Sequence, residues 1–190
     1  MFTLSGMRRL PATPEERKRR TLVVAVAAAV LLAACSRSGI SADAWVVTVC
    51  NALTPWRATI TDLNQRAQTQ MQQATTIAQT RRNLVDLVTH ARDATETARA
   101  AVVAAGVPDA PGGESAAHGF QLSLQSTRDA YDNAADDLRR LPDGDETAFY
   151  DGVVDVMDRL NRQYEQAGEK LSELDSPQLR AAFDRAPECQ

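Results

Sequence analysis

The sequence predicts an all-α domain: an antiparallel, up-down-up-down four-helix bundle with a short C-terminal helix, closed by a disulfide. Apolar residues recur at heptad spacing in four segments of about 25 to 30 residues each. Short segments rich in Gly, Pro or polar residues separate the four. The cysteines Cys50 and Cys189 lie near the two ends of this region. An up-down-up-down bundle brings those two ends to the same pole, where the thiols can pair.

The first helix is predicted to begin after Ser41, whose hydroxyl is a favourable N-cap. Its apolar positions form two rows, Val46, Leu53, Ile60 and Ala67 in one and Val49, Trp56 and Leu63 in the other. Pro55 lies inside this pattern. Because proline removes a backbone donor and crowds the carbonyl four residues earlier, we expect either a kink or a short separate helix before it.

A second helix is predicted from Thr76, which with Gln79 has the spacing of a capping box. Its apolar positions are Ile77, Leu84, Ala91, Ala98 and Ala105, with Leu87, Ala94 and Ala101 between them. Their phase slips by three residues relative to the first helix, so the chain is expected to break near 72–75. Gly106 followed by Pro108 should end the second helix, and Val107 to Gly113 is predicted to be a non-helical loop.

The third helix is predicted from about Glu114. Its rows are Ala117, Leu124, Tyr131 and Leu138, and Phe120, Thr127, Ala134 and Leu141. A turn over 142–145 should follow, with Asp145 as the next N-cap. The fourth helix has apolar positions at Phe149, Val153, Val156, Leu160, Tyr164, Ala167, Leu171 and Leu174. Ser176 and Pro177 are typical of a helix start and predict a last short helix through Phe183.

A secretion signal is predicted ahead of these helices. A basic cluster at 17–20 precedes an uncharged apolar run at 21–34. The run is shorter than the ~20 residues that a membrane-spanning helix needs, which disfavours an uncleaved anchor. The predicted divisions are an n-region 1–20, an h-region 21–34, a lipid anchor and tether 35–41, and a bundle domain 42–190. Translation from Met1 or from Met7 fits this pattern.

The end of the apolar run, Leu32-Ala33-Ala34-Cys35, resembles the lipobox of bacterial lipoproteins. The resemblance implies cleavage between Ala34 and Cys35 and lipid on Cys35. It thereby implies a protein anchored to the extracytoplasmic face of the cell membrane. Ordinary cleavage after the same small residues, followed by secretion, is the alternative. Ser36 to Ile40 is expected to be a flexible tether.

Charge and cysteine content fit an exported domain. Six of the 21 Lys and Arg and two of the 25 Asp and Glu precede Cys35, which leaves 15 against 23 and a net charge of −8. An acidic domain of this kind is not expected to bind nucleic acid. Outside the cytosol, Cys50 and Cys189 are expected to form a disulfide, with two free thiols as the alternative.

No catalytic, metal or cofactor motif is recognisable, so no enzymatic activity, metal or cofactor is expected. His90 and His118 are the two histidines, and in the predicted bundle they lie ~22 Å apart along the axis, too far to share a metal. Both are expected at the surface. The acidic segment 136–146 lacks the ligand order and the distal Glu of a calcium loop and is interpreted as helix caps and solvated charges. Asp151, Asp155 and Asp158 are interpreted as a solvated helix face.

Two features of the sequence are compatible with a ligand-binding cleft. Trp45 and Trp56 are eleven residues apart and lie on nearly the same side of the first helix, where they form either a ligand platform or core packing beside Cys50. Gly119, Gly152 and Gly168 lie inside predicted helices at a cost of about 1 kcal/mol each relative to Ala, and mark either close backbone approach or a cleft.

In layout, the whole chain after the signal resembles the small secreted helical lipoproteins of actinobacteria. The resemblance rests on Cys35, Cys50, the loop 105–109 and the ending 179–189, and the Arg-rich, Lys-poor composition agrees with it. It implies a location and an architecture, with Cys35 as the lipid site, and no binding residues. Two functions follow as expectations. One is a non-enzymatic binding or scaffold module with an envelope protein partner. The alternative is a small-molecule or metal-binding lipoprotein with a cleft in the bundle.

Overall fold

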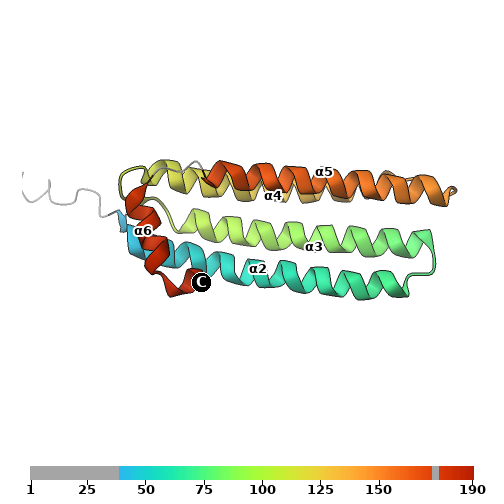
Figure 1. Ribbon diagram of the computed structural model, residues 1–190, viewed down its shortest axis with the longest axis horizontal. Coiled ribbons are helices and arrows are strands. Elements are labelled where there is room, and N and C mark those ends of the chain that lie inside the picture. The colour runs from blue at the N-terminus through green and yellow to red at the C-terminus, as the bar shows by residue number, and fades with distance from the viewer. Residues whose placement is uncertain (1–38, 173–175) are drawn as a thin grey trace, which may run out of the picture. The chain divides into compact units, whose positions relative to one another are not determined.

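A computed structural model describes residues 39–172 and 176–190, without the side chains of 170–175. The predicted signal peptide and Cys35 lie outside the described residues, as do the side chains of Leu171 and Leu174. The domain has four long helices, each of which packs on the next, and the predicted bundle is confirmed (Figure 1). They are α2 (Ala42–Gln73), α3 (Ile77–Ala104), α4 (Gly113–Arg140) and α5 (Glu146–Ser172). No helix of the described residues is long and apolar enough to cross a membrane.

The predicted N-caps form. At four helix starts a side-chain oxygen accepts a hydrogen bond from the backbone N–H three residues on, at 3.0 to 3.4 Å; the capping residues are Ser41, Thr76, Asp145 and Ser176. The return bond of the predicted capping box is shifted by one residue, because the Oε1 of Gln79 accepts from the N–H of Thr75, the residue before the cap, at 3.3 Å. The chain therefore breaks between α2 and α3 where the phase slip predicted it.

Helix α2 continues through Pro55, so the prediction of a separate helix before it is wrong. Packing on both sides of the proline holds the helix together. Val49 and Cys50 are buried before it and Leu63 after it, and the Thr54 hydroxyl donates to the carbonyl of Glu188 at 3.0 Å. These contacts outweigh the backbone hydrogen bond that Pro55 cannot donate.

The C-terminal segment closes one pole of the bundle. Helix α6 (Pro177–Arg185) packs across α2, and a 3₁₀ turn at Pro187–Cys189 follows (Figure 1). Cys189 in this turn forms the predicted disulfide with Cys50, with the sulfur atoms 1.97 Å and the Cα atoms 5.1 Å apart. We call this end of the bundle the disulfide pole.

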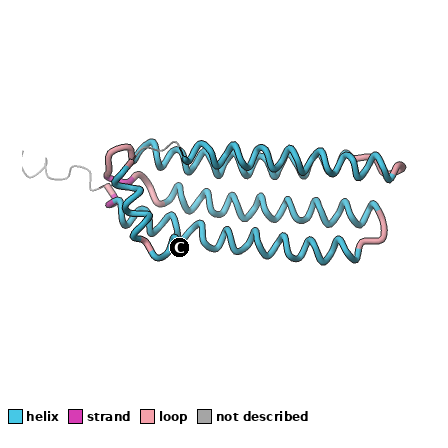
Figure 2. Tube along the Cα trace, in the orientation of Figure 1, coloured by secondary structure: helices cyan, strands magenta, loops and turns pink. Residues whose placement is uncertain are grey.

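Two residues assigned to the tether belong to the fold. The strand β1 (Ile40–Ser41) pairs in parallel with β2 (Pro108–Asp109) in the loop between α3 and α4 (Figure 2). That loop also ends one residue earlier than predicted, because Gly113 begins α4. A Cβ at Gly113 would lie 2.2 Å from the carbonyl oxygen of Pro108, so the close approach of loop and helix requires glycine.

The core has two parts. At the disulfide pole, α2, α3, α4 and α6 enclose Trp45, which is fully buried. The Trp45 ring makes edge-to-face contacts with Phe120 and Phe183 at 5.7 and 6.3 Å between centroids, and its Nε1 donates to the carbonyl of Gly106 at 2.9 Å. Core packing is therefore confirmed for Trp45. The second part lies towards the other pole, where all four long helices contribute.

Arg81 joins α3 to the turn between α4 and α5. Its Nη2 donates to the carbonyl oxygens of Leu141 and Pro142 at 2.8 and 3.2 Å and pairs with Asp143. The guanidinium also lies 5.4 Å from the ring centroid of Phe149. The predicted cap at Asp145 forms, whereas Asp143, interpreted from the sequence as a solvated charge, pairs with Arg81.

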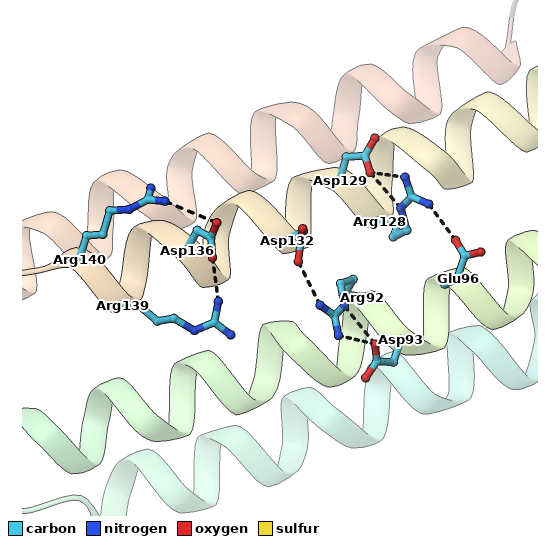
Figure 3. Close-up of polar contacts among 9 residues, drawn as sticks. All are labelled: Arg92, Asp93, Glu96, Arg128, Asp129, Asp132, Asp136, Arg139 and Arg140. Carbon is cyan, nitrogen blue, oxygen red and sulfur yellow. Dashed lines mark hydrogen bonds and ion pairs between the residues drawn. The ribbon is translucent and has the colours of Figure 1, made fainter.

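Ion pairs cross the surface between α3 and α4 (Figure 3). Arg92 pairs with Asp132 at 3.1 Å, and Arg128 pairs with Glu96 at the same distance. Glu96 also accepts from Arg99 at 2.6 Å. The hydrogen bonds from Arg99 and Arg128 lower the pKa of Glu96 to about 2, against the opposing effect of desolvation.

Candidate functional site

A groove lies between α2 and α5. Consecutive helices approach closely along the described residues, whereas α2 and α5 do not, so the bundle stays open at this seam. The seam contains a hollow of about 360 Å³. Its apolar walls are formed by Ile60, Leu63, Leu87, Val88, Met157 and Leu160. Asn64 and Asn161 place amide groups at its edges, one from each helix.

A second hollow of about 160 Å³ extends the groove towards the disulfide pole. Trp56 from α2, Ser123 and Thr127 from α4, and Gly168 from α5 line it. Tyr164 lines both hollows, which makes them parts of one groove. A Cβ at Gly168 would meet nothing within 4 Å, so this residue borders open space.

Hydrogen bonds hold the polar side chains around this extension in place. The indole Nε1 of Trp56 donates to the Thr95 hydroxyl at 3.0 Å, and that hydroxyl donates to the carbonyl of Ala91 at 2.7 Å. Ser123 donates to the carbonyl of Ala167 at 2.8 Å. Because each of these donors has an acceptor, the extension has fixed walls before any ligand arrives.

Tyr131 brings a phenol to the apolar wall. Burial raises its pKa to about 12, and the nearby Tyr164 adds to the effect. Tyr131 therefore remains neutral over the physiological range. A neutral phenol can donate or accept a hydrogen bond at little electrostatic cost, which suits recognition of an apolar ligand with an occasional polar group.

Neither histidine lines the two hollows described above, but His90 lines a third hollow of about 130 Å³ between α2 and α3, which shares Leu63 and Leu87 with the main one. The Nδ1 of His90 lies 2.7 Å from the carbonyl oxygen of Asp86, and both His90 and His118 are exposed, as predicted. Within 39–172 and 176–190, no three His, Cys, Asp or Glu side chains are grouped closely enough to hold a metal ion.

The structure shows which of the two tryptophans and three in-helix glycines border the groove and which are packed in the core. Trp56 and Gly168 line the groove, whereas Trp45 does not. Gly152 marks a close approach, because its Cβ would lie 2.5 Å from Cδ2 of Leu141. Gly119 is half-buried in α4. The predicted cleavage and lipid site at Ala34 and Cys35 lies outside the described residues.

One predicted core residue lies elsewhere. Tyr164 was assigned to the core row of α5, yet 44% of its surface is exposed and it borders the groove. Its position breaks the row, because seven residues after Val156 comes Gln163 and not Tyr164. That break is the sequence signal of a second apolar row on α5.

Comparison with protein-family models, with curated proteins and with solved structures found no match. The fold and the groove thus define the class of this protein, a disulfide-closed helical bundle with an apolar lateral groove. The resemblance to actinobacterial lipoproteins stays a prediction from the sequence.

Proposed function

We propose that the chain is a non-enzymatic binding module of the cell envelope, anchored through lipid on Cys35, and that the groove between α2 and α5 is its binding site. The observation that carries this proposal is the groove itself. Its main hollow of about 360 Å³ falls within the ~300 to 1,000 Å³ that is usual for ligand sites. Apolar walls with a few polar groups are the composition of such sites.

Two observations support the location. The lipobox-like sequence precedes the folded domain directly, and a disulfide of this kind persists in oxidising compartments outside the cytosol. Two or three acyl chains on Cys35 would anchor the protein stably, where a single chain gives only marginal binding.

The length of the tether limits how far the domain can stand from the membrane. Three residues lie between Cys35 and Gly39, so this stretch of chain spans at most ~14 Å when it is fully extended. The disulfide pole is the pole at which the chain enters the bundle.

A second candidate is a lipoprotein that binds a small apolar molecule. The extension beside Trp56 favours this candidate, because the hydroxyl groups of Ser123 and Thr127 line it and can form hydrogen bonds with a small ligand. A long helix lying in the groove would leave these hydroxyl groups without a partner in the extension. The two candidates share the groove and differ in the size of the occupant.

Photo-cross-linking in intact cells tests the proposal. A photoreactive residue replaces Asn161 at the groove edge, and a matched one replaces Arg82, which is exposed on α3 outside the groove. We expect an adduct from position 161 and none from position 82. Equal adducts at both positions, or none at either, would contradict binding in the groove.

The anchor is tested separately. Radiolabelled palmitate should enter the unaltered protein and not a Cys35→Ala variant, and the variant should leave the membrane fraction. A wild-type protein that stays unlabelled would refute the proposed lipid anchor and would not affect the proposed binding site in the groove.

A further inference from the structure

Helix α5 carries two adjacent rows of residues at alternating four and three spacing. The first row is buried or half-buried against the other helices and includes Phe149, Val153, Val156, Leu160 and Ala167. The second row lies one residue further on and consists of Tyr150, Val154, Met157, Asn161, Tyr164 and Gly168. We call this second row the outer seam.

The outer seam is exposed. Tyr150, Val154 and Tyr164 leave 41%, 58% and 44% of their surface in solvent. Single exposed apolar residues need no explanation. A strict four-three row is different, because it is the pattern by which one helix packs against another in a coiled coil. From Tyr150 to Gly168 the outer seam runs ~27 Å along the helix. Its residues from Met157 to Gly168 line the groove, and Tyr150 and Val154 continue the row beyond the two hollows.

An acidic row follows the outer seam along one edge. Asp151, Asp158 and Glu165 are seven residues apart, and each directly follows a seam residue. All three side chains are exposed and form no ion pair with another described residue. In coiled coils the charges at this edge position choose the partner, because they face charges on the other helix.

The charge of this edge argues against a second copy as the occupant. Two outer seams packed together would bring acidic residues of one copy towards those of the other, and like charges across helices are destabilising. The net charge of −8 on the region from Cys35 onward adds to that repulsion. The edge is complementary to a helix that carries Lys or Arg beside its apolar stripe.

We propose that the groove receives an amphipathic helix of a partner protein, which packs lengthwise on the outer seam of α5 and places a basic row against Asp151, Asp158 and Glu165. This inference rests on the proposed function, because it names the partner of the same site. Asn161, in the middle of the seam, favours one register of the bound helix, as a polar residue in a coiled-coil seam does.

Designed helices test the proposal against the full chain, purified in nanodiscs. One fluorescent four-heptad peptide has Leu at both seam positions and Lys at the edge positions, and its matched control has Glu in place of Lys. Three exposed ion pairs predict about tenfold tighter binding of the Lys peptide. The preference should shrink at 1 M salt, where the screening length falls to ~3 Å.

Two variants assign the binding to the seam. Replacing the acidic row, with Asp151→Lys, Asp158→Lys and Glu165→Lys together, should reverse the preference between the peptides. A triple variant with the same change in net charge at exposed sites on other helices should keep it; its substitutions are Asp86→Lys, Glu114→Lys and Asp184→Lys. Val154→Glu should abolish binding of the Lys peptide with an unchanged unfolding curve, because this side chain is exposed.

Equal binding of both peptides, or binding that survives Val154→Glu, would overturn the proposal. So would self-association of the unliganded chain that Val154→Glu abolishes, because a second copy would then occupy the seam. If neither peptide binds while position 161 still forms its adduct in cells, the basic helix is refuted and the groove remains a binding site. Loss of that adduct would instead refute the proposed function.

Discussion

Removal of the Cys50–Cys189 disulfide should strongly destabilise the domain. The bond joins residues 139 apart in the sequence. In the chain-entropy model, closing a loop of roughly 140 residues lowers the entropy of the unfolded chain by the equivalent of about 5 kcal/mol at 25 °C. Single domains unfold with a free energy of ~5 to 15 kcal/mol, so the bond contributes a third or more of the total.

The suitable variant combines Cys50→Ala with Cys189→Ala. Cys50 is only 3% exposed, and alanine avoids burying the hydroxyl that serine would bring. At about 2 to 4 °C per kcal/mol for a domain of this size, the melting temperature should fall by roughly 10 to 20 °C. Tryptophan fluorescence is a direct readout, because Trp45 packs against Phe183 of α6.

The wild-type protein in a reducing agent should have the same melting temperature as the double variant. Identical melting temperatures for the oxidised wild type and the double variant would refute the reasoning. A small change in melting temperature together with faster hydrogen exchange in α6 would also refute it, since the bond would then hold α6 in place locally and not constrain the unfolded chain.

Three further changes test other parts of the structure. Arg81→Ala should lower the free energy of unfolding in urea by about 2 kcal/mol, because it removes charged hydrogen bonds to two backbone carbonyls. The control Arg82→Ala, at an exposed neighbour, should change it by no more than ~0.5 kcal/mol. An equal loss in both variants would contradict the role of Arg81. Glu96 has a pKa lowered to about 2 from 4.5, so its ion pairs stabilise the fold above pH ~4.5 and lose that effect as the pH falls towards 2. Since this side chain is 41% exposed, Glu96→Gln should cost only about 1 kcal/mol at pH 7, a difference that should vanish near pH 2 in urea unfolding; a constant difference would exclude the carboxylate as its source. Gly168→Ala should raise the melting temperature through ~0.5 to 1 kcal/mol of helix propensity, because the new methyl group meets open space. Gly152→Ala should gain less, because its methyl group meets a leucine side chain, and a larger gain there would contradict the packing.

The helices were predictable because their signals are local. The caps at Ser41, Thr76 and Asp145 need only a side chain and a backbone N–H three residues on. The disulfide was predictable from topology, since alternating helices return the chain to the pole at which it started.

The errors concern contacts between distant segments. The pairing of Ile40 with Pro108 joins a strand and a loop that are 68 residues apart and share no sequence pattern. The continuity of α2 through Pro55 likewise depends on partners elsewhere in the chain, such as the carbonyl of Glu188. A cleft near Trp56 and Gly168 was left open by the sequence and not located between α2 and α5, because heptad rows identify the face of a helix that is apolar and not whether another helix covers it.

Helix α5 has more apolar surface than its packing in the bundle requires. A helix buried on one side needs a single apolar stripe, and the outer seam adds a second beside it. Charges that serve only solubility are expected to mix signs, as Asp155, Arg159 and Arg162 do along α5. Beside the outer seam the three positions that are seven apart, 151, 158 and 165, are all acidic, and Arg162 is the one basic residue from 151 to 165 that directly follows a seam residue. A row of like charges that runs beside an apolar seam is expected where the seam binds one particular partner helix. Each charge of the row can then pair with an opposite charge on that helix.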